Sequence, residues 1–291
     1  MISHAAGVLV AGGLALTIPA YAQKPELADL LRLAGDYHAS YVSRVSGASL
    51  DERYALTQVI TGRMNPPVYF SSDVLFVNVN GRVMGMRDPY AVDNVPLRER
   101  TPRIRTLLAE PTLEGWNKAQ DYAAEQHFRF LSDIIISLND PTLALRFLAP
   151  DIQPKLTFKL EGQKTVDGVS VASVGFKENG NRDTRFTLQT RGNGSASGRF
   201  WINPTTGAIV KSELWVNSST EAVIINVTYA EHPALGLWLP QKMSEKYEWR
   251  ELADVASNRG IGAYGARLFF QTDATYTNPQ YKPIDLSKAR R

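Results

Sequence analysis

The sequence predicts an α+β fold in which a large, curved antiparallel sheet, a half-barrel, has helices covering its concave face. The C-terminal half alternates apolar and polar residues, as in Val223–Tyr229, which is typical of strands with one covered face. Helical periodicity is confined to the first part of the chain and to an insert around residues 95–150. Because a sheet of this size cannot stay flat, we expect it to curl around the helices.

The first 22 residues predict an export signal that is cleaved after Ala22. An apolar run from Ala5 to Ala20 ends in Ala20-Tyr21-Ala22, the small-residue pattern of a signal-peptidase site. The run is shorter than the roughly 20 residues of a membrane-spanning helix, although a short membrane anchor is the alternative interpretation. Cleavage leaves residues 23–291, which we expect to form one domain in the periplasm or outside the cell.

Composition excludes several classes of protein. The chain has 32 Lys and Arg against 29 Asp and Glu, and a net charge of +3 does not call for a nucleic-acid partner. It has no cysteine, so there is neither a lipid-attachment cysteine nor a disulfide. After removal of the signal we expect a soluble protein with no integral membrane segment, stabilised by packing alone.

The N-terminal elements follow from residue spacing. Residues 25–45 place apolar side chains three and four apart, which predicts an amphipathic helix. Residues 50–60 alternate and predict a strand, with a short helix as the alternative. The two strand-like runs that flank Asn80-Gly81 predict a hairpin, because a type I′ turn needs positive φ at both central residues.

The insert around residues 95–150 predicts three helices. One follows Val95, a second starts near Pro111, and a third starts at Asn139-Asp140-Pro141 and runs to Pro150. Because the insert lies between two blocks of strands, we expect it to move as a lid.

The stretch "GRFWINPTTGAIVKSELWV", residues 198–216, predicts two strands joined by a turn at Asn203–Gly207, with Gly207 in the left-handed region. Phe200 and Ile202 share one face of the first strand, and Trp201 takes the other. We expect Trp201 to meet a helix, a partner or water.

This hairpin and the strand pair "VTYAEHPALGLWLPQKMSEKY", residues 227–247, resemble an uncharacterised family of exported bacterial proteins with a GRFWIDPxTG hairpin, in which Asp replaces Asn203. More remotely, the order of elements resembles that of the LolA-like lipoprotein-carrier superfamily. Its members are periplasmic half-barrels that hold acyl chains in an apolar cavity. The resemblance implies a lipid or lipoprotein acyl chain as ligand. It assigns no functional residue, because the shared motifs also serve turns and strand pairing.

Large aromatic side chains on the predicted strands are the candidates for lining such a pocket. They are Phe158, Phe186, Phe200, Trp215, Tyr229, Tyr247, Trp249 and Phe270. At any one of these positions a packed core is the commoner role of a strand aromatic. The sequence therefore leaves open whether the half-barrel is hollow or filled.

No catalytic, metal or cofactor site is predicted. His38, His127 and His232 lie far apart without HExxH spacing, and neither G-x-S-x-G nor S-x-x-K occurs. The charged stretches "DERY" at 51–54 and "MRDPY" at 86–90 are interpreted as an ordinary charged surface and an Asp-Pro turn. Glu245 is interpreted as lying on a solvated strand face.

The predicted function is non-enzymatic binding or carriage of an apolar or amphiphilic ligand in the concave face. One alternative is a cell-envelope scaffold that docks a partner protein through an edge strand or an exposed aromatic such as Trp201. A second is a carboxylate-dependent hydrolase, which would need carboxylates that converge in a cleft.

Overall fold

A computed structural model describes residues 26–60, 63–109, 112–125, 139–179, 186–187, 193–218, 221–249 and 268–286. The helices are α1 (Leu27–Arg44), α2 (Arg103–Ala109), α3 (Leu113–Glu125) and the 3₁₀ helices η1 (Leu143–Leu148) and η2 (Gln153–Lys155). The strands are β1 (Ala48–Ile60), β2 (Arg63–Met64), β3 (Val68–Val79), β4 (Arg82–Val92), β5 (Val95–Pro96), β6 (Leu156–Val166), β7 (Val169–Glu178), β8 (Phe186–Thr187), β9 (Asn193–Ile202), β10 (Ile209–Asn217), β11 (Glu221–His232), β12 (Leu237–Trp249) and β13 (Leu268–Tyr281). The predicted signal at residues 1–22 lies outside the described residues.

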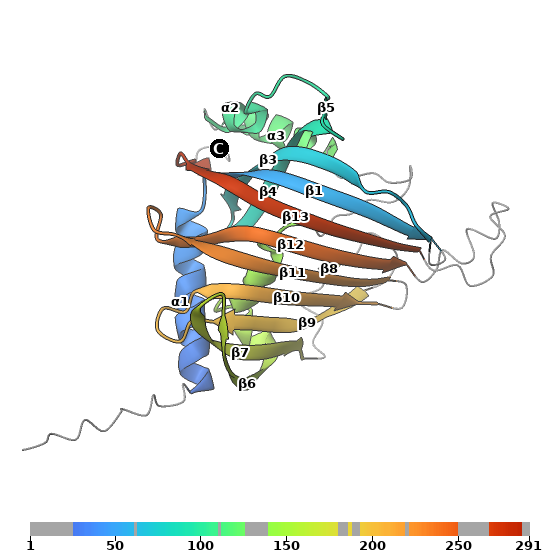
Figure 1. Cartoon of the computed structure of the whole chain (residues 1–291). Helices are drawn as coiled ribbons and strands as arrows, with labels where there is room; N and C mark the ends of the chain where they lie inside the picture. Colours follow the sequence, from blue (N-terminus) through green and yellow to red (C-terminus); the bar gives the residue numbers. More distant parts are fainter. Residues whose placement is uncertain are drawn as a thin grey trace, which may run out of the picture.

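One antiparallel sheet runs through the molecule in the order β5-β4-β3-β1-β13-β12-β11-β10-β9-β7-β6 (Figure 1). The C-terminal strand β13 pairs with β1, with Tyr54 opposite Ala274, so the first and last strands of the chain meet in the middle of the sheet. The long strands on either side are mostly joined by hairpins. The predicted strand-rich α+β architecture is confirmed.

One face of this sheet is concave and holds the main core. A single buried cluster combines α1 and η1 with residues of strands near both edges, such as Phe76 on β3 and Val174 on β7. The short helix η1 contacts both β4 and β10, which lie far apart in the strand order, so the sheet curls around that face. Helix α1 crosses the ends of the strands (Figure 1).

The predicted helical insert is divided between the two faces, which corrects the expectation that it covers the concave face as a whole. Helices α2 and α3 pack on the outer face, where Ile104 and Leu108 meet Leu75, Val77 and Met86. Strand β3 is apolar on both faces, because Val74 and Phe76 point inward while Leu75 and Val77 point outward. Of the described helices of the insert, η1 is the one that lies in the concave core, together with α1 from outside the insert.

The turns are largely as predicted. Asn80 and Gly81 have φ of 54° and 78°, the pair of positive values that the Asn-Gly hairpin requires. The third predicted helix is instead the 3₁₀ helix η1, which begins at Leu143. Before it, the Asp140 carboxylate accepts a hydrogen bond from the Thr142 amide at 2.8 Å, so residues 140–142 form a turn.

Gly207 explains how the hairpin of residues 198–216 receives helix α1. Its φ is 73°, and a Cβ atom there would lie 2.2 Å from the Leu33 carbonyl oxygen on α1. The turn itself is closed by the Asn203 side-chain oxygen, which accepts from the Thr205 amide at 2.9 Å. The Pro-Thr-Thr-Gly turn thus permits close packing of α1 at the end of the sheet.

Candidate functional site

The aromatic residues predicted to line a pocket divide between the two faces. Phe200, Tyr229, Tyr247 and Phe270 are buried in the concave core, and Phe158 packs against it half-buried. Trp215 lies on the outer face with 38 % of its surface exposed. Phe186 and Trp249 belong to β8 and β12, but the structure describes only their backbones. Five of the eight candidates therefore share one apolar face, four of them buried and Phe158 half-buried.

A segment that we call the strap, residues 139–153, crosses this concave face and contains η1. The Phe147 ring of the strap stacks on Phe176 with centroids 5.0 Å apart, and Phe176 stacks on Phe200 at 4.9 Å. Leu145 and Leu148 are also part of the concave core. The strap therefore occupies apolar space that faces the inner side of the sheet.

Hydrogen bonds among the described residues connect the strap to the rest of the fold. The Asn139 carbonyl accepts from Arg87 Nη2 at 2.7 Å, and Asp140 Oδ2 accepts from the Gly85 amide at 2.9 Å. The Tyr229 hydroxyl donates to the Pro141 carbonyl at 2.9 Å. Near the other end, Gln153 Nε2 donates to the Leu31 carbonyl at 3.0 Å. Each such bond contributes only about 1 kcal/mol net, so the strap is held by contacts that a competing ligand could replace.

The concave face is filled in this structure. Phe200, Leu214 and Phe270 have no exposed surface, and Tyr229 and Tyr247 expose at most 4 %. A side chain that lined a water-sized void would show accessible surface, so these residues line none. In this conformation the part of the half-barrel that these side chains line is packed.

A group of polar residues lies inside this apolar face and forms what we call the inner cluster: Glu52, Tyr54, Arg87, Glu245 and Thr272. Arg87 Nε donates to Glu52 Oε2 at 2.5 Å and Arg87 Nη2 donates to Glu52 Oε1 at 2.7 Å. Both side chains are buried. Burial alone would lower the pKa of Arg87, but the adjacent Glu52 carboxylate raises it well above its ordinary value. The two charges therefore neutralise each other.

Glu245 is the second carboxyl group of the inner cluster. The Tyr54 hydroxyl donates to Glu245 Oε2 at 2.8 Å, and the Thr272 hydroxyl donates to the same oxygen at 2.7 Å. Glu245 Oε1 is buried and has no hydrogen-bond partner in the part of the chain that the structure describes. Burial raises the pKa of Glu245, and the hydrogen bonds from Thr272 and Tyr54 offset only part of that effect.

The inner cluster corrects three sequence interpretations. "DERY" is not a surface mixture, because Glu52 and Tyr54 are buried, and "MRDPY" is not a turn but part of β4, with Arg87 buried. Glu245, predicted to be solvated, is 2 % exposed. The sequence did contain a signal for this burial, because residues two apart on a strand point to the same face. Glu52 is in phase with Leu50, Tyr54 and Leu56, and Glu245 is in phase with Met243 and Tyr247.

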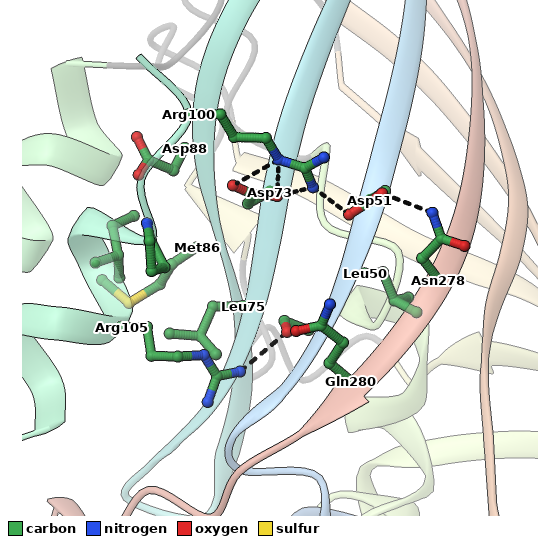
Figure 2. A pocket seen from close by; sticks show the side chains of 13 residues that line it. Leu50, Asp51, Asp73, Leu75, Met86, Asp88, Arg100, Arg105, Asn278 and Gln280 are labelled. Atoms are coloured by element: carbon green, nitrogen blue, oxygen red, sulfur yellow. Dashed lines mark hydrogen bonds and ion pairs between the residues drawn. The ribbon is translucent and has the colours of Figure 1, made fainter. Parts of the chain in front are cut away.

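A second candidate is an open cavity of about 510 Å³ on the outer face, which we call the outer groove (Figure 2). Its apolar side chains include Leu75, Met86 and Ile104. Arg100 reaches over the strands to Asp73 at 2.5 Å and also pairs with Asp51.

The other polar groups of the outer groove also have partners. Asn278 donates to Asp51 Oδ2 at 2.8 Å. Arg105 donates to the carbonyls of Gly47 and Lys282, at 2.9 and 3.1 Å. The Arg100 side chain is 44 % exposed, so its ion pairs are solvated. These contacts tie α2 and the preceding loop to the sheet, and we interpret the groove as structural.

Trp201 was the aromatic predicted to reach a helix, a partner or water. It lies on the outer face but is 2 % exposed, because Val171 and Val210 pack against it. The ammonium groups of Lys164 and Lys211 lie 4.4 Å from its ring centroid. Among the described residues, Trp201 thus packs against strand side chains and two lysines, from β6 and β10, and not against a helix or water as predicted.

Comparison with known proteins gives remote similarities. No protein-family model matches the chain, and no curated protein matches it. A putative outer membrane lipoprotein-sorting protein domain from Vibrio parahaemolyticus is similar with a TM-score of 0.38 and 8 % identity, over 87 % of this chain and 92 % of that one. A LolA superfamily protein from Nitrosomonas europaea gives 0.31 and 9 %, over 91 % and 97 %. A DUF1329 family protein from Desulfovibrio piger gives 0.34 and 11 %, over 87 % and 94 %.

These remote similarities assign neither a superfamily nor a role to the chain. Similarity to the uncharacterised GRFWIDPxTG family stays a prediction. Among the helices in the described ranges, none has the length and apolar character that crossing a membrane would require.

Proposed function

We propose that this protein is an exported, non-enzymatic binding protein that holds the apolar chain of an amphiphile against the concave face of its sheet. The observation that carries the proposal is the strap. An apolar 3₁₀ segment, whose Phe147 stacks on Phe176 of β7, lies where a ligand chain would lie. A bound chain would replace strap side chains, and release would follow their return.

The energetics of this exchange favour long chains. Burying a side chain such as Phe147 or Leu148 contributes about 1.5–3 kcal/mol, and burying a methylene contributes about 0.8 kcal/mol. A chain of about four methylenes therefore offsets only one strap side chain. A chain of twelve carbons would gain about 9 kcal/mol before ordering costs, which is enough to displace two such side chains and still bind.

A disulfide that pins the strap to α1 tests the proposal. A Cβ atom built on Gly35 would lie 3.5 Å from Pro150 Cγ, so the two residues are in van der Waals contact. A disulfide between them requires Cβ atoms about 3.8 Å apart. Because the chain has no cysteine, the Gly35→Cys/Pro150→Cys variant can form a single intramolecular disulfide. We expect the oxidised variant to lose uptake of a fluorescent twelve-carbon fatty acid.

The reduced form of the same variant is the matched control, and uptake should return when the disulfide is broken. Each single-cysteine variant should behave like the wild type under both conditions. Equal uptake by the oxidised and reduced forms would show that the strap does not guard the ligand site.

The alternative functions receive less support from the structure. Trp201 is buried, and the edge strand β6 carries a bulge between Leu160 and Gly162 and two lysines, features that protect an edge from strand addition. For a hydrolase, Glu52 is neutralised by Arg87, and neither Glu52 nor Glu245 opens to a cleft in this conformation. We therefore propose binding and not catalysis.

A further inference from the structure

Glu245 Oε1 is a buried hydrogen-bonding atom that the fold leaves unused. Glu245 lies in the middle of β12, between Ile225 of β11 and Thr272 of β13. Both hydroxyl groups that reach this carboxyl group donate to Oε2, and Oε1 receives nothing from the described residues. An unpaired polar atom buried in a core costs about 1–3 kcal/mol, so its retention calls for a reason.

The charges around Glu245 indicate which kind of group would complete it. Arg87 is the cation of the inner cluster, and its Nε and Nη2 hydrogen bonds go to Glu52 and to the Asn139 carbonyl. Within the described ranges, no lysine or arginine forms an ion pair with Glu245. The nearest described cation is Arg87, whose charge favours an ionised Glu245 but is already paired with Glu52. The unpaired oxygen of Glu245 lies on the same face as the apolar side chains of β11 and β13.

We propose that the ligand of the concave face is an amphiphile with a protonated amine, and that its ammonium group donates a hydrogen bond to Glu245 Oε1. The inference rests on the proposed function, because it assigns the polar end of the same ligand. The ammonium group supplies the donor that Oε1 lacks, together with a positive charge that Glu245 need not share with Glu52. Its apolar chain would run along the side chains of Met243, Tyr247 and Phe270, which line the same face.

Isothermal titration calorimetry with two probes of equal chain length tests this assignment. Dodecylamine, used below its critical micelle concentration, and 1-dodecanol, used below its solubility limit, differ only in the polar group. The amine is protonated at pH 7. We expect the wild-type protein to bind dodecylamine about tenfold more tightly than dodecanol, as is typical of a charge-assisted hydrogen bond.

The Glu245→Gln variant should lose this preference while it still binds dodecanol. Glu248→Gln is the matched control, because it removes the same charge from the same strand but on the outer face. The control should keep the wild-type preference. If Glu245→Gln does not fold, the ratio of the dodecylamine and dodecanol affinities of the wild-type protein still tests whether the ligand carries an amine.

The outcomes separate the two proposals. Equal binding of both probes by the wild type would overturn the amine assignment and leave the proposed function standing. Tighter binding of methyl dodecanoate than of dodecylamine, retained in Glu245→Gln, would also overturn the amine assignment. Glu245 would then be protonated and donate a hydrogen bond to the ester carbonyl, as the glutamine amide can. Binding of none of the three probes would overturn both.

Discussion

The inner cluster and the outer groove are built from neighbouring residues of the same strands. Asp51 pairs with Arg100 in the groove, while Glu52, one residue later on β1, pairs with Arg87 in the concave core. On β4, Arg87 points inward and Asp88 points outward. Strand alternation alone therefore places chemically similar carboxylates in different environments, one buried in the core and one solvated.

The environment decides what each ion pair contributes. The Arg100 pairs are solvated and screened, so they contribute at most about 1 kcal/mol. The Arg87–Glu52 pair is desolvated, so the loss of one partner leaves the other as an unpaired charge in the core. The four predictions below test this difference, in order of decreasing effect.

The largest effect is expected from Arg87→Met. It leaves Glu52 buried without its counter-charge and removes the hydrogen bond to the Asn139 carbonyl of the strap, so we expect a loss of about 3–5 kcal/mol in the free energy of unfolding. Urea unfolding measures it. The Glu52→Gln/Arg87→Met double variant should recover much of the loss, and a double variant as unstable as the single one would argue against charge burial as the cause.

The pH dependence of Glu245 should come next in size. Because burial raises its pKa in the folded state, ionisation favours the unfolded state. Protonated Glu245 contributes fully to stability below the pKa that it has in the unfolded chain, about 4.3. This contribution is lost as the pH rises through the higher pKa that Glu245 has in the folded protein. Relative to Glu245→Gln, the wild type should lose up to about 1.4 kcal/mol per pH unit in that window. Urea unfolding from pH 4 upward measures the difference, and a constant difference would contradict the account.

A smaller effect is expected from Tyr229→Phe. The substitution removes the hydroxyl that donates to the Pro141 carbonyl, which costs about 1 kcal/mol. Because the strap loses one of its hydrogen bonds, amide hydrogen exchange in η1 should become faster while the core strands keep their protection. Faster exchange spread evenly over the sheet would show that Tyr229 stabilises the whole fold and not the strap.

The smallest effect is expected from Arg100→Gln in the outer groove. Its ion pairs with Asp51 and Asp73 are partly exposed, so the free energy of unfolding should fall by less than about 1 kcal/mol. Added salt should reduce the difference further because it screens these charges. A loss as large as that of Arg87→Met would remove the distinction between the two regions.

Sequence reasoning could predict the elements whose signals are local. The spacing of Leu30 and Ala34 predicts α1, Asn80-Gly81 predicts the β3–β4 hairpin, and alternation predicts the C-terminal strands. The division of the insert could not be predicted, because β3 is apolar on both faces and its pattern does not say which helices cover which face.

The candidate site was only half predictable. Phe200, Tyr229, Tyr247 and Phe270 were found because apolar residues in phase on a strand share a face. Glu52, Arg87 and Glu245 were missed, because a charged residue in such a phase is buried only if a partner reaches it from another strand. The pairing of Arg87 with Glu52 spans 35 residues, and no local pattern records it.

The most direct test of the central claim is native mass spectrometry of the protein purified from its own cells, with solvent extraction of what co-purifies. The account predicts one amphiphile per chain, carrying an amine and a chain of about twelve carbons or more. A mass without ligand, together with no uptake of dodecylamine or a fluorescent fatty acid, would contradict a ligand site in the concave face.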